Sequence, residues 1–476
     1  MKLRRKTAVV MAAGAVMMAN AAPVLTAAEV KEMQTGALSE ETVQFYSYWK
    51  EKYLAQDPYV TGDPQYYVFY GEKTYAEAGA EVAVTVSEAH GYGMLIAASM
   101  AEHDGQAKDI FDGMYRYYKA HPSGIGPNLM AWQQTDNGSA IQNSAGADSA
   151  TDGDLDIAYA LLMADTVWGS DGAINYKQAA LAVMEDIMTY EVNQTDWVLQ
   201  LGDWAHNTRE GDTYYAATRS SDFIVQYMPV FAEASGDTRW TTLYESTYRI
   251  INQMVDTYGT GILPDFIVKD SNGKFVPASA NLLESEHDGN FYYNACRTPW
   301  RISMDYLVNG NADALKFANA LNGFITRKTG GDPAQIMAGY TPAGEAVSDW
   351  NDLCFDAPFL VVAACGGYDT WHNSLRSMIL DYGEDVYFGD TITMLCLIVD
   401  DNAWIVPTGA DQSVRGDVNQ DGACTAADVI ALQKWLLHTP DASLADWKAG
   451  DLCPDGKLNA MDLCLLRSEE RRVGKE

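Results

Sequence analysis

A chain of 476 residues is long enough for one large domain and a second, small one. Its 32 basic and 65 acidic residues give a net charge of −33, which repels nucleic acid and anionic membranes and excludes both as expected partners. The seven cysteines are odd in number and contain no CxxC pair, so neither a disulfide framework nor a zinc site is expected.

Residues 1–28 have the pattern of a secretory signal peptide. Four basic residues between Lys2 and Lys6 precede an apolar run from Ala8 to Ala19, and small residues follow that run. The run is too short to span a membrane, and no later segment offers a long uncharged apolar stretch. We therefore expect a secreted protein, found outside the cell or in a cell-surface assembly.

Residues 29–406 are expected to form a large all-α domain. In the segment 155–168, LDIAYALLMADTVW, one apolar stripe at helical spacing contains Leu155, Tyr159, Leu162, Met163 and Thr166. Similar stripes occur in residues 91–103, 174–190 and 313–327, with loops rich in glycine, aspartate and asparagine between them. A helical domain this long is expected to be an α/α toroid of paired helices, with its chemistry on the loops at one end.

A short linker, residues 407–415, leads to a small domain, residues 416–466, which contains two acidic loops of the calcium-binding type. Oxygen ligands stand at positions 1, 3, 5 and 12 around a glycine at position 6, and a backbone carbonyl supplies position 7. In the second loop the third position is Cys453, a poor calcium ligand, so this site is expected to be weaker. The expected ligands are Asp417, Asn419, Asp421, Ala423 and Asp428 in the first loop, and Asp451, Asp455, Lys457 and Asp462 in the second.

Two such loops, each ending in aspartate and followed by one helix, resemble a dockerin, the module that attaches enzymes to cellulosome scaffolds. The resemblance implies structural Ca²⁺ and a cohesin as partner. The last ten residues, 467–476, are highly charged and break the apolar pattern of the second helix, which is therefore expected to end at Leu466. They resemble the translation of a sequencing-library adapter. We therefore exclude them from the fold and expect a truncated dockerin.

Within the large domain, the segment 150–168, ATDGDLDIAYALLMADTVW, resembles the signature of glycoside hydrolase family 8. The resemblance extends to residues 85–94, 129–133, 297–306 and 387–395, and so covers most of the domain. It implies an (α/α)6 barrel and the hydrolysis of β-1,4-linked glycans with inversion. We expect the catalytic domain to be monomeric and to need no cofactor for hydrolysis.

An inverting hydrolase needs one protonated carboxyl group beside the leaving oxygen and one ionised carboxylate across the sugar, about 6.5–9.5 Å away. The resemblance implies that Glu88 is the general acid and that Asp152 contacts the sugar at the cleavage point. Ser87 is expected to cap a helix whose first turn contains Glu88. Asp154 is expected to be structural.

The general base is less evident, because the amide Asn294 occupies the position where many members of the family have an aspartate. An amide cannot usefully accept a proton from water. The resemblance is therefore to a second subfamily, which includes chitosanases and lichenases and whose base is a glutamate from the preceding loop. In NLLESEHDGNFYYN the candidates are Glu284, Glu286 and Asp288, of which Glu284, ten residues before Asn294, is favoured and Glu286 is the reserve.

Five aromatic residues in or near these motifs are expected to stack on sugar rings, where CH surfaces meet aromatic faces. They are Tyr92, Trp132, Tyr293, Trp300 and Tyr387. Asn294 is expected to position the water or the sugar. Arg297 and Arg301 are expected to hold the carboxylates or the loops around the substrate.

The expected function is that of a secreted, cellulosome-type, inverting endo-β-1,4-glycanase acting on β-glucan, either cellulose-like or mixed-linkage such as lichenan. A chitosanase of the same family is the first alternative, and an endo-xylanase the second. An alternative of another class is an inactive glycan-binding protein that shares the fold and the dockerin but lacks a base.

Overall fold

The computed structural model describes residues 36–71, 81–383 and 385–407, followed by 416, 418–419, 424–437, 439, 442, 444, 449–450, 452 and 458–473. The predicted signal peptide and most of the predicted linker lie outside the described residues. Six of the predicted calcium ligands also lie outside them: Asp417, Asp421, Ala423, Asp451, Asp455 and Lys457.

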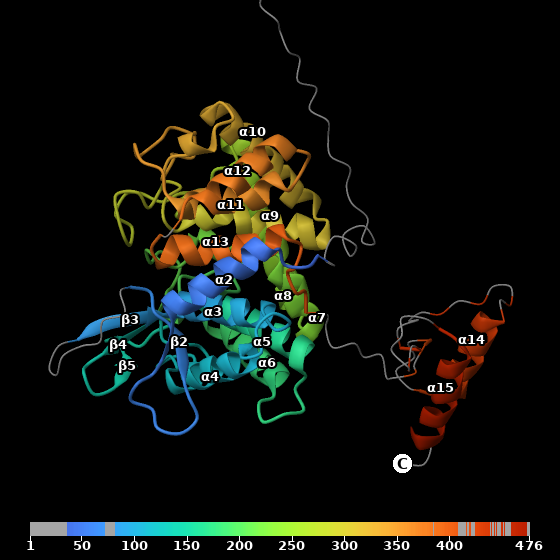
Figure 1. Cartoon of the computed structure of the whole chain (residues 1–476). Coiled ribbons are helices and arrows are strands. Elements are labelled where there is room, and N and C mark those ends of the chain that lie inside the picture. Colours follow the sequence, from blue (N-terminus) through green and yellow to red (C-terminus); the bar gives the residue numbers. More distant parts are fainter. Residues whose placement is uncertain are drawn as a thin grey trace, which may run out of the picture.

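In the described part of residues 36–407, twelve α-helices alternate between an outer and an inner position in an (α/α)6 barrel. The outer helices are α2 (Glu40–Tyr53), α4 (Ala107–Ala120), α6 (Tyr176–Tyr190), α8 (Arg239–Tyr258), α10 (Ala312–Thr329) and α12 (Asp369–Asp381). The inner helices are α3 (Ser87–Ser99), α5 (Thr151–Trp168), α7 (Tyr227–Ser235), α9 (Thr298–Asn309), α11 (Leu353–Ala363) and α13 (Tyr387–Asp400). The last helix, α13, packs against α2 and α3 and so closes the ring, as Figure 1 shows.

Most of the inner helices are buried on nearly all sides, which the sequence pattern did not predict; α7 is the exception, with four of its nine residues buried. In α5, 14 of 18 residues are buried, including Asp156 and Leu161, which lie outside the predicted apolar stripe. The single stripe was therefore too narrow a prediction, because an inner helix packs against both inner neighbours and an outer partner: α5 contacts α3, α6 and α7. The outer helix α4 keeps the expected amphipathic pattern, with Ile110, Phe111 and Met114 buried.

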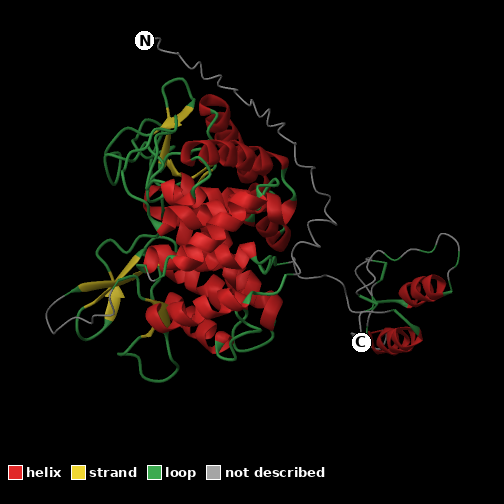
Figure 2. Cartoon of the chain, turned by 45° about the horizontal axis from the view of Figure 1, so that its top comes forward, coloured by secondary structure: helices red, strands yellow, loops and turns green. Residues whose placement is uncertain are grey.

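Four small antiparallel sheets are built from the connections between helices (Figure 2). They pair β1 (Leu54–Gln56) with β2 (Tyr66–Val68), β6 (Val192–Asn193) with β7 (Val198–Leu199), β3 (Val82–Val86) with β4 (Gln133–Asp136) and β5 (Ile141–Asn143), and β9 (Phe266–Lys269) with β8 (Thr218–Arg219) and β10 (Phe275–Pro277). Single-turn 3₁₀ helices are η1 (Asp203–Ala205), η2 (Ser220–Asp222), η3 (Ala295–Arg297) and η4 (Pro333–Gln335). Strand β3 runs directly into α3, and strand β8 into η2, so these strands determine where two of the functional loops begin.

The C-terminal domain contains the two predicted helices, α14 (Ala426–Leu436) and α15 (Ala460–Val473), which pack against each other. They share a small core that includes Val418, Leu432 and Leu466. Helix α15 continues to Val473, so the expectation that it stops at Leu466 is wrong. Glutamate and arginine have high helix propensities, and the charged residues after Leu466 therefore extend the helix.

Two expectations from composition can be compared with the described part of the chain. The cysteines described, which are all except Cys453, have free thiols. No described helix is long and apolar enough to cross a bilayer.

Candidate active site

The buried guanidinium of Arg297 brings together the predicted acid and the predicted sugar-contacting carboxylate. Arg297 Nη1 donates to Glu88 Oε2, and to Asp152 Oδ2 at 2.8 Å. Its Nη2 donates to Ser221 Oγ at 3.1 Å and to Asn294 Oδ1 at 3.2 Å. One side chain from η3 therefore connects the first turns of α3 and α5 with the loop that contains Asn294.

The first turns of α3 and α5 approach each other unusually closely. A Cβ atom on Gly153 would lie 2.5 Å from Ser87 Oγ and 2.7 Å from the Ser87 carbonyl carbon. Only glycine fits at this contact, so Gly153 of the TDGD motif allows Glu88 and Asp152 to reach the same guanidinium. Ser87 is the first residue of α3 and makes no capping bond, since Val86 at the end of β3 is the N-cap; the expected cap is wrong.

The environment of Glu88 favours its protonated form. Its side chain is only 17% exposed, and burial raises its pKa, as does the nearby charge of Asp152. The charge of Arg297 opposes this effect, and so does the hydroxyl of Tyr387, which donates to Glu88 Oε1 at 3.0 Å. The balance leaves the pKa of Glu88 above its ordinary value, as a general acid at neutral pH requires.

The pKa of Asp152 is shifted in the opposite direction. Burial disfavours its charge, but the charges of Arg297 and Arg219 outweigh burial and hold its pKa below the ordinary value. Arg219 Nη1 lies 3.6 Å from Asp152 Oδ1, on the side opposite to Arg297. When the pKa values of two neighbouring carboxyl groups are shifted in opposite directions, one group can act as an acid while the other stays charged.

Of the three candidate bases, Glu284 is the one linked to this network. Asn294 Nδ2 donates to Glu284 Oε2 at 2.7 Å, and the same amide accepts from Arg297 through its oxygen. Glu284 and Glu286 are both exposed, while Asp288 is buried. The Asp288 carboxylate accepts the backbone N–H groups of residues 283, 284 and 285 at 2.7, 3.1 and 2.8 Å. Asp288 therefore shapes the loop that carries Glu284, and we no longer consider it a base.

Asp265, which the sequence analysis did not single out, holds the loop around Asn294. Its carboxylate accepts the backbone N–H of Tyr292 at 2.8 Å, of Ala295 at 2.7 Å and of Asn294 at 3.2 Å. Burial raises its pKa to about 7 against the effect of these donors. The residue lies just before β9 in a segment without any motif, so no local signal identified it.

Two further buried carboxyl groups, those of Asp154 and Glu191, are structural. Asp154 is fully buried and accepts the Met130 N–H at 2.8 Å. Burial holds the pKa values of Asp154 and Glu191 well above their ordinary values. Ser149 Oγ donates to Glu191 Oε1 at 2.5 Å. This arrangement agrees with the expectation that Asp154 is structural.

The structure corrects part of the predicted aromatic surface. Tyr92 and Trp300 are 0% exposed, so the prediction that they stack on sugars is wrong. Both are on inner helices and point into the packed interior, where the hydroxyl of Tyr92 accepts from Arg297 Nη1 at 3.2 Å. Tyr387 is nearly buried and acts through its hydroxyl on Glu88. Trp132, 38% exposed, and the half-buried Tyr293 remain accessible.

Arg301 follows Arg297 by four residues and stabilises the packing of the barrel helices rather than the candidate acid. Its guanidinium forms a buried pair with Asp156, with Nη1 2.9 Å from Asp156 Oδ1. Tyr227 donates to the same oxygen at 2.8 Å. This cluster ties α9 to α5 and α7.

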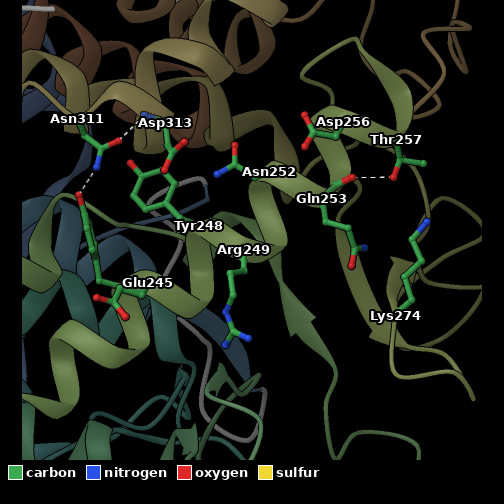
Figure 3. A pocket seen from close by; sticks show the side chains of 11 residues that line it. Glu245, Tyr248, Arg249, Asn252, Gln253, Asp256, Thr257, Lys274, Asn311 and Asp313 are labelled. Carbon is green, nitrogen blue, oxygen red and sulfur yellow. Dashed lines mark hydrogen bonds between the residues drawn. The ribbon is translucent and has the colours of Figure 1, made fainter.

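A polar pocket on the outer helix α8 is separate from these carboxylates (Figure 3). Asn311, at the N-cap of α10, donates to the Tyr244 hydroxyl at 2.6 Å, and Tyr244 donates to the buried Asp305 at 2.8 Å. Tyr248 donates to Asp305 as well, at 2.5 Å. Because these polar groups hydrogen-bond one another, the pocket is a polar contact region between α8 and α10.

In the C-terminal domain, three predicted calcium ligands can be placed. Asp428 and Asp462 are buried in the first turns of α14 and α15. Asp428 accepts the backbone N–H of Asn419 at 3.2 Å, and Asp462 that of Asn459 at 2.9 Å. Each carboxylate is thus folded back onto its own loop. Buried carboxylate oxygens facing such a loop fit a hard cation such as Ca²⁺.

Comparisons with known proteins show the family of the chain. The sequence model of glycosyl hydrolases family 8 matches residues 22–402, and that of the dockerin type I domain matches residues 415–469. A beta-glucanase from Niallia circulans is 44% identical over 359 residues, which are 75% of this chain and 83% of the relative. Endoglucanase A from Acetivibrio thermocellus is 31% identical over 384 residues, which are 75% and 73% of the two chains.

Solved structures give the same result. The apo structure of a beta-1,3-1,4-glucanase from Paenibacillus sp. X4 is 40% identical, has a TM-score of 0.70, and is matched over 80% of this chain and 94% of its own. A cold-adapted family 8 xylanase shares the fold with a TM-score of 0.62 at 15% identity, over 79% and 94% of the two chains. The chain therefore belongs to glycosyl hydrolase family 8, as a glycoside hydrolase whose (α/α)6 barrel is followed by a type I dockerin.

Proposed function

We propose that the protein is a secreted, inverting endo-β-1,4-glycanase that hydrolyses β-glucan, either cellulose-like or mixed-linkage. The observation that carries the proposal is the Asn294 amide, which bonds both Arg297, the partner of the acid Glu88, and Glu284. The names of the relatives, beta-glucanase, endoglucanase and beta-1,3-1,4-glucanase, support β-glucan as the substrate.

In this mechanism Glu88 gives its proton to the glycosidic oxygen as the bond to the anomeric carbon breaks. Water attacks the anomeric carbon from the opposite face of the ring and transfers a proton to Glu284. Asp152 stays ionised, supports the protonated state of Glu88 before the bond breaks, and accepts a hydrogen bond from the sugar. Exchange with solvent then returns the proton from Glu284 and reloads Glu88.

Asn294 orients the base instead of replacing it. Its Nδ2 donor occupies Glu284 Oε2, which leaves Oε1 to accept the proton from water. Asp265 keeps Asn294 in place through the backbone N–H of Asn294 and through those of its neighbours. Glu284 thus lies on an exposed loop, but its partner Asn294 is held by the buried carboxylate of Asp265.

Matched substitutions test the assignment of the base. Glu284→Gln removes the proton acceptor and is expected to lower kcat by roughly a hundredfold or more. Glu286→Gln, also on the exposed loop, is the control and is expected to keep near-normal turnover. If Glu284→Gln keeps near-normal turnover, the assignment is wrong. If only Glu286→Gln loses it, Glu286 is the base.

The substrate and the stereochemistry are tested together. Reducing-sugar release is measured on barley β-glucan, carboxymethylcellulose, chitosan and xylan, with the highest rate expected on β-glucan. Proton NMR of the first product is expected to show the α-anomer, since inversion converts a β-linkage. The highest rate on chitosan would make the protein a chitosanase, and a β-anomer as first product would contradict inversion.

The dockerin is proposed to bind a cohesin through Ca²⁺-ordered loops, which places the enzyme in an extracellular cellulosome. Removal of calcium by a chelator is expected to abolish the complex with a type I cohesin in native gels while hydrolysis by the monomeric catalytic domain continues. A complex that persists without calcium would contradict the proposed role of the Asp428 and Asp462 loops.

A further inference from the structure

We propose that Tyr293, Trp350 and Asp352, here called the Asp352 shelf, form a sugar subsite next to the base that binds a glucosyl unit away from the cleaved bond. The inference rests on the proposed function, since it assumes a glycan chain across Glu88 and Glu284. It adds Trp350 and Asp352, which neither the motifs nor the catalytic carboxylates indicate.

The first observation is the exposure of one large aromatic ring. Trp350 is 46% exposed, whereas most aromatic side chains of the barrel are buried. Among the barrel residues that the structure describes, Trp132 and Tyr382 are the two other aromatic side chains that are comparably exposed. Rings that remain in water on an otherwise well-packed domain are typical of surfaces that bind a ligand.

The second observation is that the Trp350 ring is held in place by one edge. Its Nε1–H donates to the Tyr293 hydroxyl at 3.4 Å, and Tyr293 donates to Asp352 Oδ2 at 2.9 Å. The Trp350 carbonyl accepts the Ala338 N–H at 2.8 Å, which fixes the backbone. The ring face is therefore exposed but ordered, and binding a ligand to an ordered ring loses little conformational entropy.

The third observation is the carboxylate that holds Tyr293. Asp352 is half-buried at the N-cap of α11 and is held there by the Cys354 N–H at 3.3 Å. A carboxylate beside aromatic rings can accept hydrogen bonds from sugar hydroxyls while the rings stack on the CH face.

The shelf is continuous with the catalytic candidates. Tyr293 directly precedes Asn294, whose amide holds Glu284. Trp132, the other exposed tryptophan of the barrel, is linked to the acid loop through its backbone, since its carbonyl accepts the backbone N–H of Ser87, the residue before Glu88. Binding energy at a sugar unit away from the cleaved bond favours long chains over short ones.

The test compares Trp350→Ala and Trp350→Phe with the wild-type full chain on the polymer that the wild type hydrolyses fastest, and on cello-oligosaccharides of increasing length. Trp350→Ala is expected to raise KM for the polymer about tenfold, with kcat changed much less and the preference for longer oligosaccharides lost. Trp350→Phe retains an aromatic face and is expected to recover most of the affinity. Trp435→Ala, in the dockerin and 36% exposed, is the matched control and is expected to leave KM unchanged.

A binding assay separates the shelf from the chemistry. In the Glu88→Gln background, retention on immobilised β-glucan is expected to fall when Trp350→Ala is added, while circular dichroism stays that of the parent. Unchanged KM and unchanged retention in Trp350→Ala would overturn the shelf. Hydrolysis of chitosan in place of β-glucan would overturn the proposed substrate but not the shelf, which the KM comparison on chitosan then tests.

Discussion

Asp152→Asn is expected to move the alkaline limb of the pH profile of kcat/KM to lower pH. In the wild type, the negative charge of Asp152 raises the pKa of Glu88, while Arg297 lowers it. The substitution removes the negative charge and keeps the shape of the side chain, so that Arg297 acts on Glu88 without opposition. Since Glu88 must be protonated to act as the acid, activity is then lost at a lower pH than in the wild type.

The geometry gives the size of this effect. Arg297 Nη1 contacts both carboxylates, so their nearest oxygens lie within about 5 Å of each other. Two unit charges at this separation interact by about 0.8 kcal/mol in water and by about 3.3 kcal/mol at an effective dielectric constant of about 20. The expected displacement of the limb is therefore between about 0.6 and about 2.4 pH units.

The assay is the initial rate on barley β-glucan at low substrate concentration, from about pH 4 to about pH 10, where kcat/KM reports the free enzyme. Glu286→Gln, an exposed carboxylate on the base loop, is the control and is expected to leave the limb in place. Thermal melting of each variant ensures that the loss of activity is not unfolding. A limb that stays at the wild-type pH, or moves upward, would refute the electrostatic coupling between Asp152 and Glu88.

Two further predictions concern the supports of the site. Burial raises the pKa of Asp265 to about 7, so the folded state binds this proton more tightly than the unfolded state does. The contribution of Asp265 to the free energy of unfolding therefore falls as the pH rises from about 4 to about 7, by up to about 4 kcal/mol. Urea unfolding is expected to show a smaller loss of stability over this range for Asp265→Asn than for the wild type, and an equal loss would contradict the raised pKa. Gly153→Ala is expected to destabilise the fold by about 1–3 kcal/mol and to lower activity, because its Cβ would meet Ser87 at 2.5 Å. The control Gly172→Ala meets no atom within 4 Å, and equal melting temperatures for the two variants would contradict the close approach.

Local motifs, through their resemblance to known families, were enough to predict the barrel, the C-terminal domain and the two carboxylates at the helix starts. Glu88 lies in the first turn of α3, directly after β3, and Asp152 lies in the first turn of α5, so the residues next to them in sequence carry the motif. The Asn294 amide in the same way directed attention to the loop ten residues upstream, where Glu284 bonds it. Residues close in sequence share these features, and a motif can therefore describe them.

The tertiary structure decided which aromatic residues face solvent and which groups hold the base loop. Tyr92 and Trp300 fit the motifs as well as Trp132 does, yet both are buried, because α3 and α9, which carry them, are covered on nearly all sides in the closed ring. Asp265 reaches Asn294 across 29 positions, and Trp350 reaches Tyr293 across 57. Contacts at such separations depend on how the ring of helices closes, and short-range patterns carry no information about that closure.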